Sequence, residues 1–353
     1  MTVKRPTFTQ QKICCVADLH FGVHQNNPMW HDIAINWATW LRDALKKQKI
    51  TDIFISGDFF HYRAEIAVNT IQLATDILTI WKDFNIVMII GNHDSYYKDR
   101  IDVNSLSILK GWKNITIIET PTSTNLFGRD ILFCPWGTQS EELIKSDIIF
   151  GHFEIESFKM NHFKVCTEGI KSKDLLDNSD LVFSGHFHHR EEREYKKGKI
   201  VYVGNPYQMD FGDVNCTKGY YIIDIPNKTY EFHENTISPE HKKVLLSDLI
   251  KHPGITAEVK KIFAKNIVKF IIDRHISPDE IEFLLSKFSE LETLSITTDY
   301  AINFDKFGID EQDTSGISGV DIPTAIEEFI GLLDIEDKPT IIEQTLELYR
   351  SSK

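Results

Sequence analysis

Five strand-like runs in the first half of this chain each end in a short polar motif, and this pattern constrains the fold most strongly. The runs are rich in β-branched and apolar residues, as buried strands are. They cover residues 13–17, 53–56, 86–90, 148–150 and 181–184. The motifs that follow them are Asp18-Leu19-His20, Gly57-Asp58, Gly91-Asn92-His93-Asp94, Gly151-His152 and Gly185-His186-Phe187-His188. Imidazole, carboxylate and amide groups bind divalent metals, so converging strand ends would form a metal site.

The segments between the motifs predict an α/β fold. Apolar residues recur at helical spacing over residues 30–47 and 65–84. With the first three strands, these helices form a strand–helix alternation, which places ligands at the carboxyl ends of the strands. Beyond Asp94 the pattern shortens into strands at residues 115–119, 131–134, 200–203, 219–225 and 229–234. We therefore expect two β-sheets packed on each other as a sandwich, with helices outside.

The remaining third of the chain predicts separate small parts. Residues 242–262 are charged and are predicted to be partly helical, and a strand, a helix and a strand follow at 268–273, 278–291 and 294–298. The segment after them is rich in Gly, Asp and Ser without periodicity, which predicts a linker. We expect a main domain at residues 1–237, a small α/β domain at 238–302, a linker at 303–320 and a helical hairpin at 321–353.

The two helices of this hairpin each carry an apolar face. The first face comprises Ile326, Phe329, Ile330 and Leu333, and the second comprises Ile342, Leu346 and Tyr349. A pair of short helices buries little surface by itself. The hairpin is therefore expected to dock on the main domain or on a partner, and the linker favours the partner.

The net charge of −13 at first argues against a nucleic-acid binder, because such domains are usually basic. Residues 301–353 hold 12 acidic and 4 basic residues, so they contribute −8 and the rest of the chain only −5. Two bound divalent cations would offset much of that remainder locally. Acidity therefore does not exclude a phosphodiester substrate, but it suggests that another subunit supplies much of the grip on a polyanion.

Apolar runs and cysteines indicate the compartment in which the protein is located. No apolar run approaches the ~20 residues of a membrane span, and the first residues lack the apolar stretch of a signal peptide. The five cysteines include no CxxC pair, which favours buried reduced thiols. We expect a cytoplasmic protein without membrane contact, located in the host cytoplasm if the source is viral.

The motif residues suffice for a two-metal centre. Hydrolysis of a phosphate ester by two metals ~3.5–4 Å apart requires an anionic ligand between them, and Asp58 is the natural bridge. Asp18, His20 and one further His then remain for the first metal, and Asn92 with two His for the second. The three histidines left for these places are His152, His186 and His188.

His93 is left without a metal in this count. Because it follows Asn92 directly, its side chain is expected to face away from the ligands and toward a leaving group. A His in that place suits general acid catalysis. Asp94 could orient it.

The five motifs, in this order, resemble those of the calcineurin-like metallophosphoesterase superfamily over residues 12–235. Within it the chain resembles the nuclease subunit of the SbcD type, the partner of an SMC-like ATPase in DNA double-strand-break processing. Three segments carry this narrower resemblance: Gly57-Asp58-Phe59-Phe60-His61, Gly151-His152-Phe153-Glu154-Ile155 and Tyr202-Val203-Gly204-Asn205-Pro206-Tyr207. Asn205 departs from the serine usual in the last of them. The order of the domains also matches the family's layout, and the C-terminus looks like the phage or bacterial kind.

The resemblance implies a four-layer metallophosphoesterase sandwich that works as a DNA exonuclease and endonuclease in recombination or repair. Manganese would be the metal, with magnesium supporting less activity. Asp18, His20, Asp58 and His188 would hold one ion, and Asp58, Asn92, His152 and His186 the other. His61 and His93 would act on the substrate.

The resemblance also implies partners. Residues 238–302 would cap the active site and recognise DNA, and the hairpin would bind the ATPase coiled coil. The family usually dimerises through helices near the active site, for which residues 65–84 and 104–110 are candidates. The sequence assigns no DNA-binding residues.

Two alternatives stay open at this point. The chain could be a phosphatase or another phosphodiesterase of the same superfamily. Protein phosphatases, however, usually read Gly-Asp-x-Val-Asp-Arg-Gly, and purple acid phosphatases place a metal-binding Tyr where this chain has His61. It could also be a non-catalytic scaffold, although every ligand position holds a competent residue.

Overall fold

The computed structural model describes residues 6–160, 164–250, 257–273, 286, 288–300, 323, 326–327, 330–331 and 337–351. The chain forms two compact units. The larger consists of Met1–Lys243, Thr256–Val268 and Ser289–Ile296, and the smaller of Val244–Ile255, Lys269–Phe288 and Thr297–Lys353. The predicted domain limits at residues 237, 302 and 320 stay a prediction.

A six-stranded sheet carries the first three motifs. Its order is β12-β11-β1-β2-β3-β4, and β1 to β4 run parallel while β11 and β12 are antiparallel additions. Because the parallel strands share one direction, the motifs after β1, β2 and β3 emerge at the same edge. The strands are β1 Lys12–Val16, β2 Asp52–Ile55, β3 Asn85–Ile89, β4 Ile115–Ile118, β11 Gly219–Asp224 and β12 Thr229–Glu234.

A second six-stranded sheet carries the last two motifs. Its order is β5-β6-β7-β8-β10-β9, with β6, β7, β8 and β10 parallel and an antiparallel strand at each edge. The motifs that end β7 and follow β8 therefore emerge together as well. The strands are β5 Thr122–Leu126, β6 Arg129–Cys134, β7 Ile148–His152, β8 Leu181–Gly185, β9 Glu191–Tyr195 and β10 Gly198–Tyr202.

The two sheets pack face to face over an aromatic core. The ring of Phe150 lies 4.7 Å from Phe54 of the first sheet, and 5.6 and 5.7 Å from Phe133 and Phe183 of its own sheet. These phenylalanines belong to one buried cluster with residues of β1, β3 and β11. Burial on both faces explains why the central strands read as nearly continuous apolar runs.

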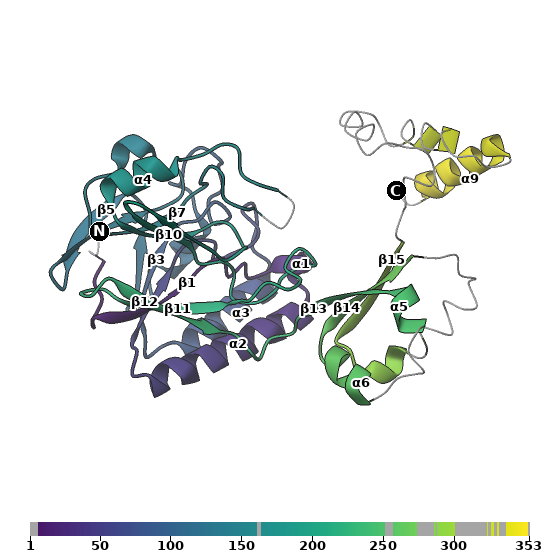
Figure 1. Ribbon diagram of the computed structural model, residues 1–353, viewed down its shortest axis with the longest axis horizontal. Helices are drawn as coiled ribbons and strands as arrows, with labels where there is room; N and C mark the ends of the chain where they lie inside the picture. Colours follow the sequence, from purple (N-terminus) through teal and green to yellow (C-terminus); the bar gives the residue numbers. More distant parts are fainter. Residues whose placement is uncertain are drawn as a thin grey trace. The chain divides into compact units, whose positions relative to one another are not determined.

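Helices cover the outer faces and complete four layers (Figure 1). Trp37 and Trp81 pack α2 and the end of α3 on the first sheet, with their rings 5.6 Å apart. Leu175 and Leu176 pack α4 on the second. The predicted α/β sandwich is thus confirmed. The helices are α1 Val23–Asn26, α2 Pro28–Lys47, α3 Val68–Ile80, α4 Ser172–Asn178 and the short 3-10 helices η1 Ser105–Leu109 and η2 Ser140–Glu142.

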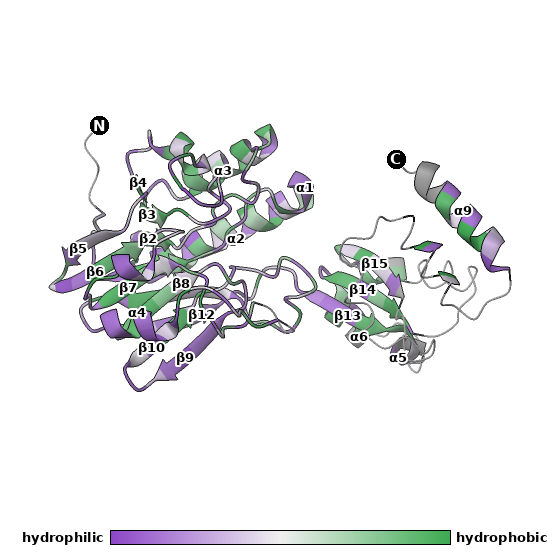
Figure 2. Ribbon diagram, turned by 90° about the horizontal axis from the view of Figure 1, so that it is seen from above, coloured by the Kyte–Doolittle hydropathy of each residue, from purple (hydrophilic) through white to green (hydrophobic). Residues whose placement is uncertain are grey.

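Three strands were absent from the sequence expectations. Edge strands β5 and β9 have the sequences TSTNL and EEREY, and Figure 2 shows β9 as almost wholly hydrophilic. An edge strand facing solvent needs no apolar run, so the pattern that revealed the central strands was missing. The third is β13 His241–Leu245, which lies at the start of the segment 242–262 that was expected to be helical in part.

The C-terminal third contains a three-stranded sheet, in the order β13-β14-β15. The strands β14 Ile267–Ile272 and β15 Ser295–Tyr300 agree with the prediction, and the helical elements are α5 Leu246–Ile250, α6 Ala257–Phe263 and η3 Ser289–Leu291. Most of the helix expected at 278–291 and the whole linker lie outside the described residues. None of the helices in the described part of the chain is long and apolar enough to cross a membrane.

The second helix of the predicted hairpin is present as α9 Lys338–Ser351. Ile330 and Leu346 from the expected apolar faces are buried, and Ile326 and Ile342 are half-buried. Phe329 and Leu333 lie outside the described residues, and for Tyr349 only the backbone is described. The partner-binding role of this face stays a prediction.

Candidate metal centre

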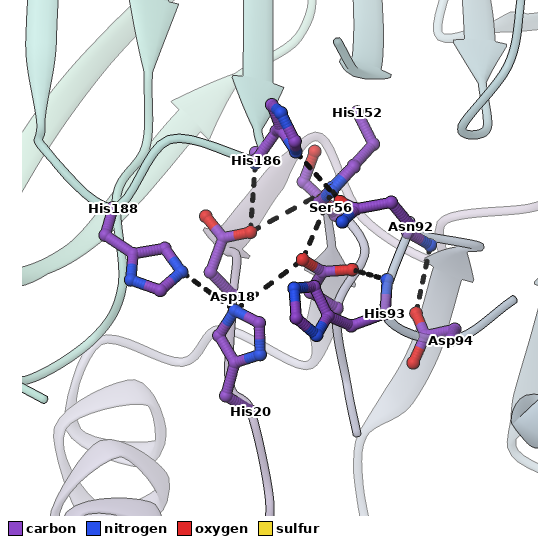
Figure 3. Close-up of polar contacts among 12 residues, drawn as sticks. Asp18, His20, Ser56, Asn92, His93, Asp94, His152, His186 and His188 are labelled. Carbon is purple, nitrogen blue, oxygen red and sulfur yellow. Dashed lines mark hydrogen bonds and ion pairs between the residues drawn. The ribbon is translucent and has the colours of Figure 1, made fainter. Parts of the chain in front are cut away.

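The structure brings all seven predicted metal ligands to one edge of the sandwich. They arrive from the ends of five strands, and Figure 3 shows the labelled side chains pointing toward one another. Four ligands lie two to four residues after strands of the first sheet, and His152 is the last residue of β7. Asp18, His20, Asp58 and His152 are almost completely buried, so their polar atoms need partners within the protein or a bound ion.

One group of ligands gathers around His20. Its Nε2 lies 2.8 Å from Nε2 of His188 and 3.6 Å from Oδ2 of Asp58. Asp18, His20 and Asp58 each place a ligand atom within 4.8 Å of the others. This group therefore unites all four residues expected at the first metal.

The second group gathers around Asn92. Its Oδ1 lies 2.9 Å from Nε2 of His152 and 2.8 Å from Nδ1 of His186. Nε2 of His152 is also 3.4 Å from Oδ2 of Asp58. Asp58, His152 and His186 meet the same 4.8 Å criterion. Asp58 thus belongs to both groups, which is the position expected of a bridging carboxylate.

The tautomer of His152 fits a metal ligand. Its Nδ1 lies 2.7 Å from the carbonyl oxygen of Ser56, and because a carbonyl only accepts, this nitrogen carries the proton. In the neutral ring, Nε2 then presents a lone pair toward the oxygens of Asn92 and Asp58. A metal cation would take the place of the proton between these electron-rich atoms.

The carboxylate of Asp18 has one oxygen that a cation would satisfy. Its Oδ1 accepts a hydrogen bond from the backbone N–H of His186 at 2.9 Å, but Oδ2 is buried without any hydrogen-bond partner. Leaving a buried carboxylate oxygen unsatisfied is costly. The residues present therefore fit a divalent cation beside Asp18.

Strained backbone at the ligands supports a site maintained for function. Asp18, His20, Asp58 and His186 adopt positive φ angles of 55°, 47°, 54° and 96°. Non-glycine residues rarely do so, and such strain persists only where surrounding contacts enforce it. These residues lie in the turns after β1, β2 and β8.

The motif glycines let these turns approach one another. A Cβ on Gly57 would lie 2.3 Å from Nδ1 of His152, and one on Gly91 would lie 2.1 Å from Oδ1 of Asp58. Both distances are far below van der Waals contact. Glycine in these motifs is thus explained by close packing of the ligand loops.

The charge states agree with metal binding. Burial lowers the pKa of His20 and His188, and it lowers the pKa of His186 to about 3, so these rings are neutral. Burial raises the pKa of Asp18 to about 7, partly opposed by His152. Burial also acts against ionised Asp58, but the attraction of His152 outweighs it and keeps the pKa of Asp58 below its usual range. A cation would stabilise both carboxylates.

The contacts of Asp94 differ from the expectation that it orients His93. One carboxylate oxygen accepts hydrogen bonds from the backbone N–H groups of Phe59 and Phe60, both at 3.0 Å. The other oxygen accepts a hydrogen bond from the backbone N–H of Gly91 at 2.9 Å. Asp94 therefore joins the loops after β2 and β3. Burial raises its pKa to about 7.

His93 is held by His61 and Asp58 instead. Nδ1 of His93 lies 2.6 Å from the carbonyl oxygen of His61, and the backbone N–H of His93 donates to Oδ1 of Asp58 at 2.8 Å. The ring of His61 stacks on that of His93, and its Nδ1 is 3.3 Å from Nδ1 of His20. His20, His61 and His93 also satisfy the distance criterion for holding a metal.

Three further residues belong to this site but were not identified from the sequence. Trp136 packs its ring 5.0 Å from that of His186. Lys218 donates to the carbonyl oxygen of His188 at 2.7 Å and also contacts Asp213. Their only sequence signal is position: Trp136 follows β6, at the same edge as the motifs, and Lys218 precedes β11.

Comparison with known proteins agrees with this geometry. The chain is 27% identical to "Exonuclease subunit 1" of Enterobacteria phage T4, over 96% of this chain and 98% of that protein. It is 26% identical to the D subunit of the nuclease SbcCD of Staphylococcus epidermidis, over 61% of this chain and 66% of that protein. The corresponding SbcCD protein of Staphylococcus saprophyticus is 25% identical, over 62% of this chain and 66% of that protein.

The family comparison covers the part of the chain that supplies the metal centre. The family model described as "Calcineurin-like phosphoesterase" matches residues 11–190, which include every predicted metal ligand. Enzymes of this kind are metal-dependent hydrolases of phosphate esters, and the candidate ligand groups agree with that metal dependence. The chain therefore belongs to the calcineurin-like phosphoesterase family.

Proposed function

We propose that this chain is a DNA nuclease, both exonuclease and endonuclease, that acts with an SMC-like ATPase of the SbcC type in recombination or repair. The observation that carries the proposal is the convergence of seven ligands into two groups that share Asp58. Relatives whose names include exonuclease and nuclease subunits support DNA as the substrate.

The two ligand groups support an assignment of the metals. Asp18, His20, Asp58 and His188 would hold one divalent ion, and Asp58, Asn92, His152 and His186 the other, with manganese preferred over magnesium. When bound, two such ions supply positive charge for the phosphoryl oxygens and make water more acidic. The carboxylate and amide oxygens among these ligands suit manganese.

His93 would deliver a proton to the departing oxygen. A general acid must start as the protonated ring, in which both nitrogens carry a proton; because Nδ1–H donates to the carbonyl of His61, the proton to be transferred is the one on Nε2. The carbonyl fixes the ring orientation and leaves the second nitrogen for the substrate. His61, stacked against the same ring, is positioned to contact the substrate beside it.

The other parts of the chain would serve assembly. We assign residues 1–237 to the nuclease domain, 238–302 to a capping domain for DNA recognition, 303–320 to a linker and 321–353 to the hairpin that binds the ATPase. A homodimer would form through residues 65–84 or 104–110. Exposed Val68, Ile71 and Ile108 in these segments offer apolar surface for such a contact.

The decisive experiment compares substrates. Purified protein with manganese is expected to cleave linear duplex and hairpin DNA, and Asp58→Asn should abolish cleavage because both ions lose a ligand. Asp180→Asn is the matched control, since Asp180 pairs with Lys228 at the opposite end of the strands. Cleavage of nitrophenyl phosphates with DNA left intact would instead identify a phosphatase.

A further inference from the structure

A buried ion pair supports the loop that carries His188. Lys218 and Asp213 are 4% and 5% exposed, and Nζ of Lys218 lies 2.5 Å from Oδ1 of Asp213. The same Nζ donates to the carbonyl oxygen of His188 at 2.7 Å. One ammonium group therefore connects a candidate metal ligand to a carboxylate that is 25 residues away in the sequence.

The carboxylate of Asp213 is itself held firmly. Its Oδ2 accepts the side-chain N–H of Asn205 at 3.0 Å and the backbone N–H of Met209 at 2.9 Å. With Lys218 on Oδ1, both oxygens are occupied. Asp213 thus joins the segment after β10 to the His188 loop through Lys218.

The close packing around this pair leaves little freedom. A Cβ on Gly204, whose φ is +73°, would lie 2.8 Å from the carbonyl oxygen of His188. A pocket of about 320 Å³ is lined by His186, His188, Asp210 and Asp213. The His188 carbonyl is therefore closely packed against Gly204, while Asp213 and the ligand loop line a pocket.

Stability alone does not account for a buried pair of this kind. Removing two charges from water is expensive, and well-packed apolar residues often replace such pairs without loss of stability. An apolar pair has no group that could donate a hydrogen bond to the His188 carbonyl. Such a pair also lacks the charge that fixes this donor in place.

We propose that Lys218 and Asp213 are positioning residues that hold His188 at the first metal. The inference rests on the proposed metal pair. Nε2 of His188 faces His20, and within the described part of the chain no hydrogen bond or ion pair joins Lys218 or Asp213 to the side chains of the second group. Their effect is therefore specific to one of the two ions.

The test measures manganese binding to the full chain, by titration calorimetry and by the electron paramagnetic resonance of coupled ions. Wild type is expected to bind a coupled pair. Lys218→Met should weaken one of the two sites 10–100-fold, as loss of a supporting contact typically does, and leave the other unchanged. Lys228→Met is the matched control, because this lysine pairs with Asp180 and Asp147 away from the ligands.

A second variant decides the matter if Lys218→Met does not fold. Asp213→Asn retains the size of the side chain but removes the charge that holds Lys218, and should weaken the same site. If each site binds manganese with the same affinity in the variants as in wild type, this inference alone is overturned. A wild-type chain without a pair of ions would overturn the proposed function and this inference with it.

Discussion

At the scale of single residues, a backbone carbonyl fixes one ring nitrogen in each of two site histidines. Nδ1 of His152 donates to the Ser56 carbonyl and Nδ1 of His93 to the His61 carbonyl. Only Nε2 of each ring is then left for another partner. With a lone pair there a neutral ring can bind a metal, as proposed for His152, and a protonated ring can donate a proton, as proposed for His93.

Replacing His93 tests whether this residue is a metal ligand or a proton donor. His93→Ala should keep two manganese ions, because its contact with Asp58 comes from the backbone N–H. DNA cleavage should fall about 10²–10⁴-fold, as expected for loss of a general acid. Metal content and cleavage rate are measured on the same preparation, with His233→Ala as control. A reduced metal content would show that His93 is a ligand.

The metal-free protein should lose stability as pH rises from 6.5 to 9. Burial opposes protonation of His152, but the charge of Asp58 outweighs it and raises the pKa to about 9. Because the folded state binds this proton more tightly than the unfolded state, the free energy of unfolding falls across that window, by on the order of 3 kcal/mol.

Thermal unfolding in EDTA at several pH values checks this expectation. His152→Asn should remove most of the slope. Added manganese should reverse its sign, because metal binding requires the neutral ring. A metal-free protein whose stability is constant between pH 6.5 and 9 would contradict the proposed charge pair.

At the scale of elements, the strand ends determine the site, because parallel strands deliver their loops to one edge. The two sheets meet there through glycines rather than side chains. A Cβ on Gly185 would lie 2.2 Å from the carbonyl oxygen of Ser56, which is the group that orients His152. The packing of Gly185 against Ser56 thus sets the position of the His152 ring.

Gly185→Ala should therefore impair both stability and metal binding. The added methyl must displace backbone, which costs about 1–3 kcal/mol. Gly111→Ala is the matched control, since a Cβ there meets nothing within 4 Å. Denaturant unfolding and manganese titration give the two readouts. Equal behaviour of the two variants would show that the close approach is unimportant.

At the scale of the whole molecule, charge is divided unevenly between a nearly balanced catalytic part and an acidic C-terminus. Residues 301–353 contribute −8 of the total −13. Such a segment would repel DNA rather than bind it. Its amphipathic helix α9 is better suited to a protein partner, which would then supply the positive surface for the duplex.

Deletion of residues 320–353 tests this division of labour. The truncated chain should fail to bind the ATPase subunit, because the apolar hairpin faces are gone. Manganese-dependent cleavage of short DNA should persist, since no candidate ligand is removed. Size-exclusion chromatography of the mixed subunits and a cleavage assay measure the two effects. Complex formation by the truncated chain would exclude the hairpin as the main contact.

The sequence by itself determined the central strands and the sandwich architecture, and it contained the candidate ligand set. Burial on both faces requires apolar runs, and a metal site requires particular residue types directly after them, so both leave a local record. The edge strands β5 and β9 left none, because a solvent-facing edge accepts polar residues.

Only the tertiary structure decided how the ligands are supported. The carbonyl that holds His93, the loops joined by Asp94 and the Lys218–Asp213 pair behind His188 depend on residues brought together from separate strands. A backbone carbonyl is present at every position, and a single Lys or Asp is common. Their roles arise from three-dimensional proximity, which no local pattern in the chain encodes.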